Sequence, residues 1–356
     1  MNLLDRYITV TVLKGVAMVT FVLISVITFI DFMGQLADVG TEQYELGTAV
    51  SYVALRVPRM IFQLLPAAAL IGALFSLGNL AVHRELVVMR ASGVSRLRLM
   101  GSVACAGCVL MVIMAVLGES LAPSLGAYAR ELRATAMLDT EDLADASSTW
   151  LKDGDRIVNL RREANGVAFG GVYLYELDAD KGLKQVAHAD TANIDQANRW
   201  ILGNYAETVF GGPEGIRAGA ESEAIKDYGL SLELLDLSVV RHDLLDTAGL
   251  TRYIDYLEAN DLDATPHLIA YWARMADIVS VLLMCMLALP FVFGGLRSAG
   301  TGARLLVGLL IGLGYYVTAQ AFANSGQVFD LDPRVVAWLP SAVLLLITGV
   351  AFVRIR

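Results

Sequence analysis

The sequence predicts an α-helical membrane protein with six transmembrane helices and an all-β domain inserted between helices 3 and 4. Hydrophobic residues make up 56% of the 356 positions and charged residues only 18%. The apolar residues gather in long uncharged runs such as 16–30 and 278–293. Because a helix needs roughly 20 mainly apolar residues to cross the hydrocarbon layer, these runs indicate membrane spans. Acidic residues instead crowd between Glu131 and Asp263, where we expect the inserted domain.

Three spans precede the insert and three follow it. The apolar runs place them at about 12–33, 57–80, 99–121, 267–293, 305–323 and 335–353. The third run ends near Glu119 and Pro123, and the second contains Pro66, which neighbouring membrane helices can accommodate. We therefore divide the chain into 1–130 (helices 1–3, with a cytoplasmic helix near 83–95), 131–262 (the β domain) and 263–356 (helices 4–6).

The insert has the pattern of short strands. Residues 171–178 alternate and end in Asp-Ala-Asp-Lys-Gly, and Trp200-Ile-Leu is followed by Gly203 and Asn204. Such β-runs closed by turn formers predict a sandwich or roll. Residues 251–258 predict a short helix leading back to the bilayer. All three cysteines lie in apolar runs, so the domain is expected to fold without disulfides.

Basic residues in the short loops predict the orientation, because loops rich in Lys and Arg stay in the cytoplasm. Four groups fall on one side of a six-span topology: Arg6 and Lys14; Arg84, Arg90, Arg96 and Arg98; Arg297 and Arg304; Arg354 and Arg356. The acidic loop with Asp38, Glu42 and Glu45, the insert and the turn 330–334 fall on the other side. We expect an inner-membrane protein with both termini cytoplasmic and the large domain periplasmic.

The sequence predicts no enzyme active site, metal site or cofactor site. It contains no G-x-x-x-x-G-K-[ST] and no Gly-Lys dipeptide, so we expect any ATP and magnesium to be bound by a partner. Cys105 and Cys108 have the spacing of a metal or redox pair, but they lie in an apolar run without a nearby histidine. We predict no catalytic residues and no nucleic-acid partner.

The segment Arg84–Ser95 is a short amphipathic stretch in a predicted cytoplasmic loop. Leu86, Met89 and Arg90 share one helical face, and Gly93 is placed to end the helix. One interpretation is an interfacial helix lying on the lipid. The other is a coupling helix that seats in a groove of a separate ATPase and moves the adjoining spans.

Five motifs, taken in order and spacing, resemble the LptF/LptG permease family of the lipopolysaccharide-export ABC transporter. The resemblance covers nearly all the membrane part, is specific at the run that begins with Glu85, and is weaker in the insert. The opening favours the LptG branch, with the LptF branch as the alternative. The motifs are Leu4–Ile8, Pro66–Leu74, Glu85–Gly93, Gly295–Ser298 and Leu339–Ser341.

The resemblance implies a permease subunit that extracts lipopolysaccharide from the inner membrane and passes it to a periplasmic bridge. It implies a heterodimer with LptF, a dimer of the ATPase LptB, and the periplasmic-bridge proteins LptC and LptA. It also implies a β-jellyroll fold for the insert. The residues expected to couple the chain to the ATPase are Arg84, Glu85, Leu86, Met89, Arg90 and Gly93.

A lipid A substrate would need an apolar cavity, placed by the resemblance between the two subunits, and a cation for its phosphate. Arg56 and Arg59 begin the second span on the periplasmic side and are the candidates, although they could instead anchor the helix by snorkelling. Asp31 and Phe62 complete the predicted substrate-binding set. The family often has basic residues at the outer end of the first helix, where this chain has Asp31 and Asp38; a bridging divalent cation is one explanation.

Gly308 and Gly312 have the small-xxx-small spacing that lets helices approach closely. Packing within the chain and contact with a partner subunit are both compatible with it. We include these glycines and Tyr315 in a predicted partner interface, because the resemblance implies that the first and fifth helices meet the partner.

Two other functions compete with lipopolysaccharide export. One is an ABC-type membrane subunit that transmits force to a periplasmic partner without moving a lipid. The other is a membrane receptor that binds a ligand with its insert. The run that begins with Glu85 is evidence against the receptor.

Overall fold

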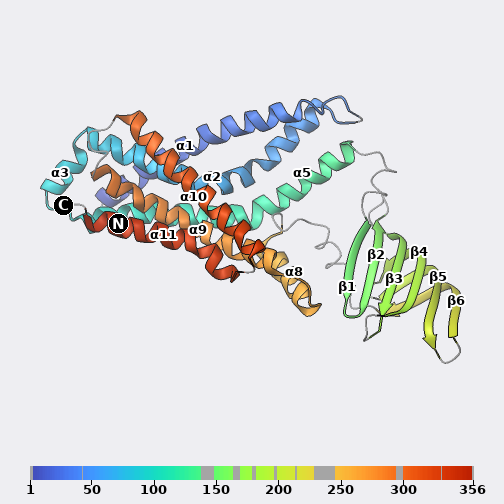
Figure 1. Cartoon of the computed structure of the whole chain (residues 1–356). Coiled ribbons are helices and arrows are strands. Elements are labelled where there is room, and N and C mark those ends of the chain that lie inside the picture. The colour runs from blue at the N-terminus through green and yellow to red at the C-terminus, as the bar shows by residue number, and fades with distance from the viewer. Residues whose placement is uncertain are drawn as a thin grey trace. The chain divides into compact units, whose positions relative to one another are not determined.

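The computed structural model describes residues 3–41, 43–137, 148–162, 169–178, 182–195, 199–212, 215–227, 245–293, 300–329 and 331–354 (Figure 1). Its contacts divide the chain into two units. The first contains Met1–Asp38, Ala49–Ala129 and Thr265–Arg356, and the second contains Val39–Thr48 and Arg130–Ala264. The motif Gly295–Ser298 and residues Glu42, Asp330 and Arg356 lie outside the described residues.

Six helices of the described chain are long and apolar enough to span a membrane, as predicted. They include one continuous helical segment, Arg96–Met137, built from three parts. In chain order the elements that lie wholly or partly in the first unit are α1 (Leu3–Gln35), α2 (Leu46–Val82), α3 (Glu85–Ala91), α4 (Arg96–Val116), the π-helical turn η1 (Leu117–Leu121), α5 (Ala122–Met137), α9 (Thr265–Phe293), α10 (Thr301–Val328) and α11 (Pro333–Arg354).

The helix that contains the third predicted span does not end near Glu119 and Pro123 but continues to Met137. Proline usually breaks a helix because it lacks an N–H and its ring clashes with the carbonyl four residues earlier. Here the π-helical turn η1 ends at Leu121, two residues before Pro123. A π turn changes the hydrogen-bond spacing locally, so the helix accommodates the proline without ending.

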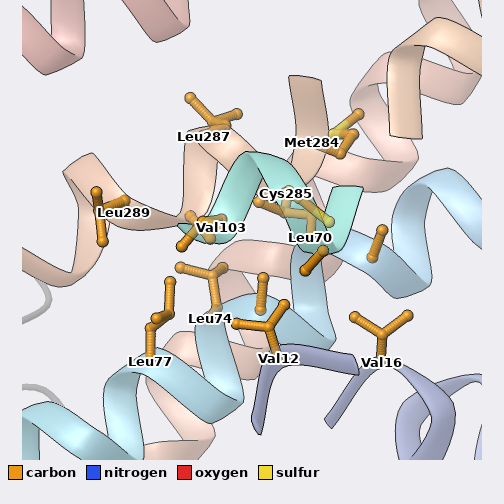
Figure 2. Packing of buried hydrophobic residues seen from close by; sticks show 14 of the residues in the cluster. Val12, Val16, Leu70, Leu74, Leu77, Val103, Met284, Cys285, Leu287 and Leu289 are labelled. Atoms are coloured by element: carbon orange, nitrogen blue, oxygen red, sulfur yellow. The ribbon is translucent and has the colours of Figure 1, made fainter. Parts of the chain in front are cut away.

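The core of the first unit lies where α2 and α9 meet α1 and α4. Figure 2 shows this cluster of buried side chains. In their most apolar windows α2 and α9 are 67% and 61% buried, whereas α1 and α10 are only 6% and 11% buried. Helices α2 and α9 are therefore central, and α1 and α10 present apolar surface outward. Labelled members of the cluster are Val12, Val16, Leu70, Leu74, Leu77, Val103, Met284, Cys285, Leu287 and Leu289.

Helices α1 and α2 make close backbone contact at Gly15 and Gly72. A Cβ atom on Gly72 would lie 2.6 Å from the Val16 nitrogen and 2.9 Å from the Gly15 carbonyl carbon. A Cβ atom on Gly15 would lie 2.8 Å from the Gly72 oxygen and would overlap Ser76. Because backbone cannot move aside as a side chain can, only glycine fits at both positions.

The described strands of the second unit form one six-stranded antiparallel sheet in the order β1-β2-β3-β4-β5-β6. This confirms the all-β prediction for the insert. The predicted helix at 251–258 is also present, as α8 (Thr247–Ala259). The strands are β1 (Ser148–Asp153), β2 (Arg156–Arg162), β3 (Phe169–Leu177), β4 (Leu183–Ile194), β5 (Arg199–Gly212) and β6 (Gly215–Asp227).

One predicted turn is wrong: β5 does not stop at Gly203 and Asn204 but runs on to Gly212. Asn204 has a left-handed backbone conformation with φ 52°, which asparagine tolerates better than most residues. The alternation of buried and exposed residues changes there, since Leu202 and Tyr205 are both buried. The turn-forming pair therefore makes an irregularity within a strand.

We predict that Gly72→Ala lowers the free energy of unfolding by about 1–3 kcal/mol, as overpacking does in a well-packed core. The reason is the missing space beside Val16. Gly101→Ala on α4 is the control, because a Cβ atom there meets nothing within 4 Å. Thermal denaturation of the purified protein in detergent compares them, and equal melting temperatures would contradict the close contact.

Candidate lipid cavity and coupling helix

The first unit contains an apolar cavity of about 1100 Å³ between α1, α2 and α4. Among its lining side chains only three carry a polar atom, the hydroxyl groups of Thr20, Ser25 and Thr28. The Ser25 hydroxyl donates to the Phe21 carbonyl oxygen of its own helix. The rest of the lining is Leu13, Val16, Ala17, Phe21, Ile24, Phe29, Phe32, Val50, Val53, Ala54, Val57, Ile61, Leu65, Val109, Leu110, Ile113 and Leu117.

A cavity with this lining suits hydrocarbon. It offers almost no hydrogen-bonding group, and burying a polar ligand group without a partner would cost several kcal/mol. Apolar surface of a ligand that enters the cavity is removed from water, which contributes roughly 25 cal/mol of favourable free energy per Å². The ligand that fits is a chain or ring of carbon atoms, and any polar head must lie outside.

Asp31 and Arg56 join α1 to α2 beside the phenylalanine-rich part of the cavity, where Phe29 and Phe32 belong to its lining. The Arg56 Nη1 atom donates to both carboxylate oxygens of Asp31 at 2.9 Å. The Arg56 guanidinium also lies over the Tyr52 ring, 5.3 Å from its centroid. The Arg56 side chain is 35% exposed and the Asp31 side chain 20%. The structure thus pairs two residues of the predicted substrate-binding set, and Asp31 neutralises the cation.

The other two members of that set lie differently. Phe62 packs on Gly118 of the π-helical turn, where a Cβ atom would lie 2.5 Å from Cε2 of the ring. Its neighbours Ile61 and Leu65 line the cavity, whereas Phe62 does not. Arg59 is half-buried, one turn along α2 from Arg56. Their roles in binding stay predictions.

The predicted coupling segment forms the short helix α3. Arg84 precedes it with a left-handed φ of 61°, and Gly93 follows it with φ 91°. The Gly93 N–H donates to the Arg90 carbonyl oxygen at 3.1 Å, so the glycine ends the helix as predicted. Ser95 then caps α4 by accepting a hydrogen bond from the Arg98 N–H. The two loops around α3 are therefore tight turns.

One face of α3 packs on the helix bundle and the other is exposed. Leu86 is 1% exposed, and Met89 packs on the same core cluster. Val87 and Val88 on the opposite side are 43% and 65% exposed. These valines are not among the residues predicted to couple the chain to an ATPase, although two β-branched apolar residues in a short loop helix are a signal for an apolar contact surface.

Polar contacts connect this region to three spans. The Tyr7 hydroxyl of α1 donates to Glu85 Oε2 at 2.8 Å. Asp5 of α1 accepts from Arg98 Nε of α4 at 3.1 Å and from the Ser102 hydroxyl at 3.1 Å. The Arg90 guanidinium lies 5.6 Å from the centre of the Phe293 ring at the end of α9. Helix α3 and its neighbours are thus held to α1, α4 and α9.

The predicted interface glycines contact α2 of the same chain. A Cβ atom on Gly308 would lie 3.0 Å from Leu74 Cδ1, and one on Gly312 would lie 2.9 Å from the Ala67 Cβ. The Tyr315 hydroxyl lies 3.1 Å from the Ser341 hydroxyl of α11. These contacts are the packing within the chain that the spacing allowed; a partner interface at these residues stays a prediction.

Arg304, which was predicted to lie in a cytoplasmic loop, is a buried residue of α10. It lies in the first turn of α10, is 2% exposed and packs on Gly78 of α2, where a Cβ atom would be 2.5 Å from its Nη1. No local pattern distinguishes it from the basic residues that are exposed near the same helix ends.

These features define a class of protein: a multi-pass membrane subunit with an apolar ligand cavity and a short helix exposed at the end of its spans. The comparisons with known proteins specify it further. The family model described as "Lipopolysaccharide export system permease LptF/LptG" matches residues 6–354. The chain belongs to this family.

Two relatives illustrate the similarity. The Escherichia coli (strain K12) lipopolysaccharide export system permease protein LptG is 33% identical over 348 residues, covering 98% of this chain and 97% of the relative. The protein of the same name from Haemophilus influenzae is 31% identical over 341 residues, covering 96% and 95%. The similarity therefore extends over both units, including the insert, where the motifs were weakest.

We predict that Leu86→Ala detaches α3 from the bundle and costs about 2–5 kcal/mol of stability, as deletion of a buried leucine does. Val88→Ala is the matched control on the same helix and should stay within about 0.5 kcal/mol, because its side chain is exposed. Melting temperature and protease cleavage within 84–95 measure the two effects. Equal behaviour of the variants would refute this packing of α3.

Proposed function

We propose that this chain is the LptG-type permease subunit of a lipopolysaccharide exporter, and that the α1–α2–α4 cavity holds lipid A acyl chains. The observation that carries the proposal is the cavity itself: about 1100 Å³ with an almost wholly apolar lining, in a member of a lipopolysaccharide export family. The other end of each bound lipid, phosphorylated and hydrophilic, would remain outside the hydrocarbon-lined space.

We further propose that the helix ends near α3 face the cytoplasm. Arg90 belongs to α3, and Arg84, Arg96 and Arg98 flank it. The contacts of Asp5 with Arg98 and of Arg90 with Phe293 bring the ends of α1, α4 and α9 to the same side. Retention of basic loops in the cytoplasm supports this orientation. The β-sheet unit would then be periplasmic, since the insert separates a third from a fourth span.

In this orientation Asp31 and Arg56 lie toward the periplasmic end of the cavity, where a lipid phosphate would be. A phosphate can bind Arg56 by replacing Asp31 or by sharing the guanidinium with it. Arg59 is one turn away on the same helix and is the second candidate. The Asp31 carboxylate is therefore part of the head-group site in this proposal, as the competitor for its main cation.

Energy would come from a separate ATPase that binds α3. The exposed Val87 and Val88 give that partner an apolar contact, and Glu85 supplies a carboxylate at the start of the helix. By analogy with the family we propose an LptB dimer as the ATPase, LptF as the second permease subunit, and LptC and LptA as the proteins that receive lipopolysaccharide. This chain would carry no nucleotide or cofactor itself.

We predict that Ile113→Trp reduces the lipopolysaccharide that co-purifies with the complex by at least about half, because the indole occupies space that acyl chains would fill. Ile113 lines the cavity, whereas the adjacent Val112 does not and is 60% exposed. Val112→Trp is therefore the matched control.

The same complexes, reconstituted in lipid with the ATPase, should transfer lipopolysaccharide to an acceptor only with ATP. Intact ATP hydrolysis without any transfer by the parent complex would favour a force-transmitting subunit instead. Normal lipid binding by Ile113→Trp would remove the cavity from the proposal.

We predict that Glu85→Ala weakens co-purification of the ATPase while the membrane part stays folded. Tyr7→Phe separates two explanations, because it removes the internal hydrogen bond to Glu85 but leaves the carboxylate available to a partner. If Glu85 serves the ATPase, Tyr7→Phe should keep at least about half of the bound ATPase. Equal losses in both variants would mean that Glu85 acts only by holding α3 to α1.

A further inference from the structure

The sheet of the second unit has one buried and one exposed face, and the exposed face carries a row of aromatic and polar residues. Trp150 of β1 stands opposite Asn159 of β2, which stands opposite Tyr173 of β3, which stands opposite His188 of β4. Neighbouring strands lie about 4.8 Å apart, so the row spans roughly 14 Å across the sheet. The adjacent residues in each strand point to the other face, and Leu151, Val158, Val172 and Ala187 are indeed buried there.

The aromatic rings of this row, together with Tyr175 two residues further along β3, form two pairs and are accessible. Trp150 is 62% exposed and stacks on Tyr175, with ring centroids 5.9 Å apart and planes 25° apart. Tyr173 is 43% exposed and lies 4.5 Å from the His188 ring. Each ring is steadied by a neighbour while a large part of its surface stays open. A tryptophan this exposed contributes little to the core of its own domain.

Polar groups border the rings on one side. Asn204 Nδ2 donates to Asp190 Oδ2 at 3.0 Å, and Asp190 Oδ1 lies 3.8 Å from His188 Nδ1. The Asp190 side chain is 58% exposed. Beyond His188 the row continues with Ala206 and Ala220, which are exposed and small. The surface thus combines aromatic rings, a carboxylate and an amide, next to an exposed area where the side chains are small.

The geometry points to a saccharide-binding surface, formed by Trp150, Tyr173, Tyr175, His188, Asp190 and Asn204, which we call the aromatic platform. A sugar ring has a face of C–H groups that packs on an aromatic ring and a rim of hydroxyl groups that pair with carboxylates and amides. A protein-binding core would instead be a continuous apolar patch depleted of charge, whereas here polar side chains alternate with rings.

The saccharide is the sugar portion of the transported lipopolysaccharide, and this identification rests on the proposed function. The acyl chains and the sugars would then be bound by different units of the chain: hydrocarbon in the α1–α2–α4 cavity, and carbohydrate on the exposed face of the sheet. Nothing in the cavity lining could bind a sugar, because it offers only three hydroxyl groups.

Titration of the purified full-length chain with lipid-free oligosaccharide, released from rough lipopolysaccharide by mild acid, tests the platform. Calorimetry gives the affinity, and saturation-transfer NMR shows whether sugar protons contact aromatic rings. We expect Trp150→Ala and Tyr173→Ala each to weaken binding about tenfold, which corresponds to ~1.4 kcal/mol, and Trp150→Phe to stay within about threefold of the parent. Ile216→Ala on β6, also strongly exposed, should have no effect.

Absence of saturable binding by the parent chain, or parent-like affinity of both alanine variants, overturns the proposal. So does a result in which Trp150→Ala leaves saccharide affinity intact but reduces co-purification of a periplasmic protein, since the platform would then be a protein contact. Matching melting temperatures establish that the variants are folded. The titration needs neither ATP nor a partner, so a chain that fails to export lipopolysaccharide but binds the oligosaccharide would refute only the proposed function.

Discussion

The close contact of α1 with α2 at Gly15 and Gly72 determines the shape of the membrane unit. Backbone atoms meet there, so the two helices have a fixed crossing point. Further along α1 the residues facing the cavity include Phe21, Phe29 and Phe32, which are too large for a second contact of that kind. The helices therefore leave a space between them along this stretch, and the Asp31–Arg56 ion pair joins them again beside the cavity. Small residues followed by large ones along one helix are the physical origin of the cavity.

The same helix connects the cavity with the coupling region. Helix α1 runs without interruption from Leu3 to Gln35, a length of roughly 50 Å at 1.5 Å per residue. Its first turns hold Tyr7 and Asp5, which bind Glu85 and Arg98, and its last turns hold Asp31. Under the proposed function, a partner that displaces α3 would act on one end of a stiff rod that crosses α2 at Gly15. Movement at the mouth of the cavity follows from that geometry without any relay of side chains.

The sequence predicted the elements whose signal is local. Six apolar runs became six spans, Gly93 ended α3, and residues 251–258 lay in a helix. It missed features that depend on how helices are rotated against each other. Asp31 and Arg56 were both selected, but nothing local indicated that they pair across 25 positions. The contact of Phe62 with Gly118 was likewise not predicted, because the direction in which Phe62 points depends on the helix opposite; its role at the substrate stays a prediction.

One helix and one strand are longer than the sequence predicted. Turn-forming residues such as Pro123 and Asn204 were interpreted as boundaries, and in each case the element continues through a local irregularity. A π-helical turn and a left-handed residue each absorb the misfit over a few residues. Local composition cannot distinguish an irregularity of this kind from a true end, since both use the same residue types.

The pairing of Asp31 with Arg56 changes how an anionic head group would be recognised. A bare arginine at the cavity mouth would carry a full charge at all times, whereas this pair is nearly neutral until a ligand arrives. Partly exposed ion pairs of this type contribute only about 0–1 kcal/mol, and both side chains retain solvent contact. A phosphate, with more charge and more acceptor oxygens than a carboxylate, can compete successfully for the guanidinium. Under the proposed function, the pair would add a weak link between α1 and α2 in the absence of ligand and would give way to a lipid phosphate.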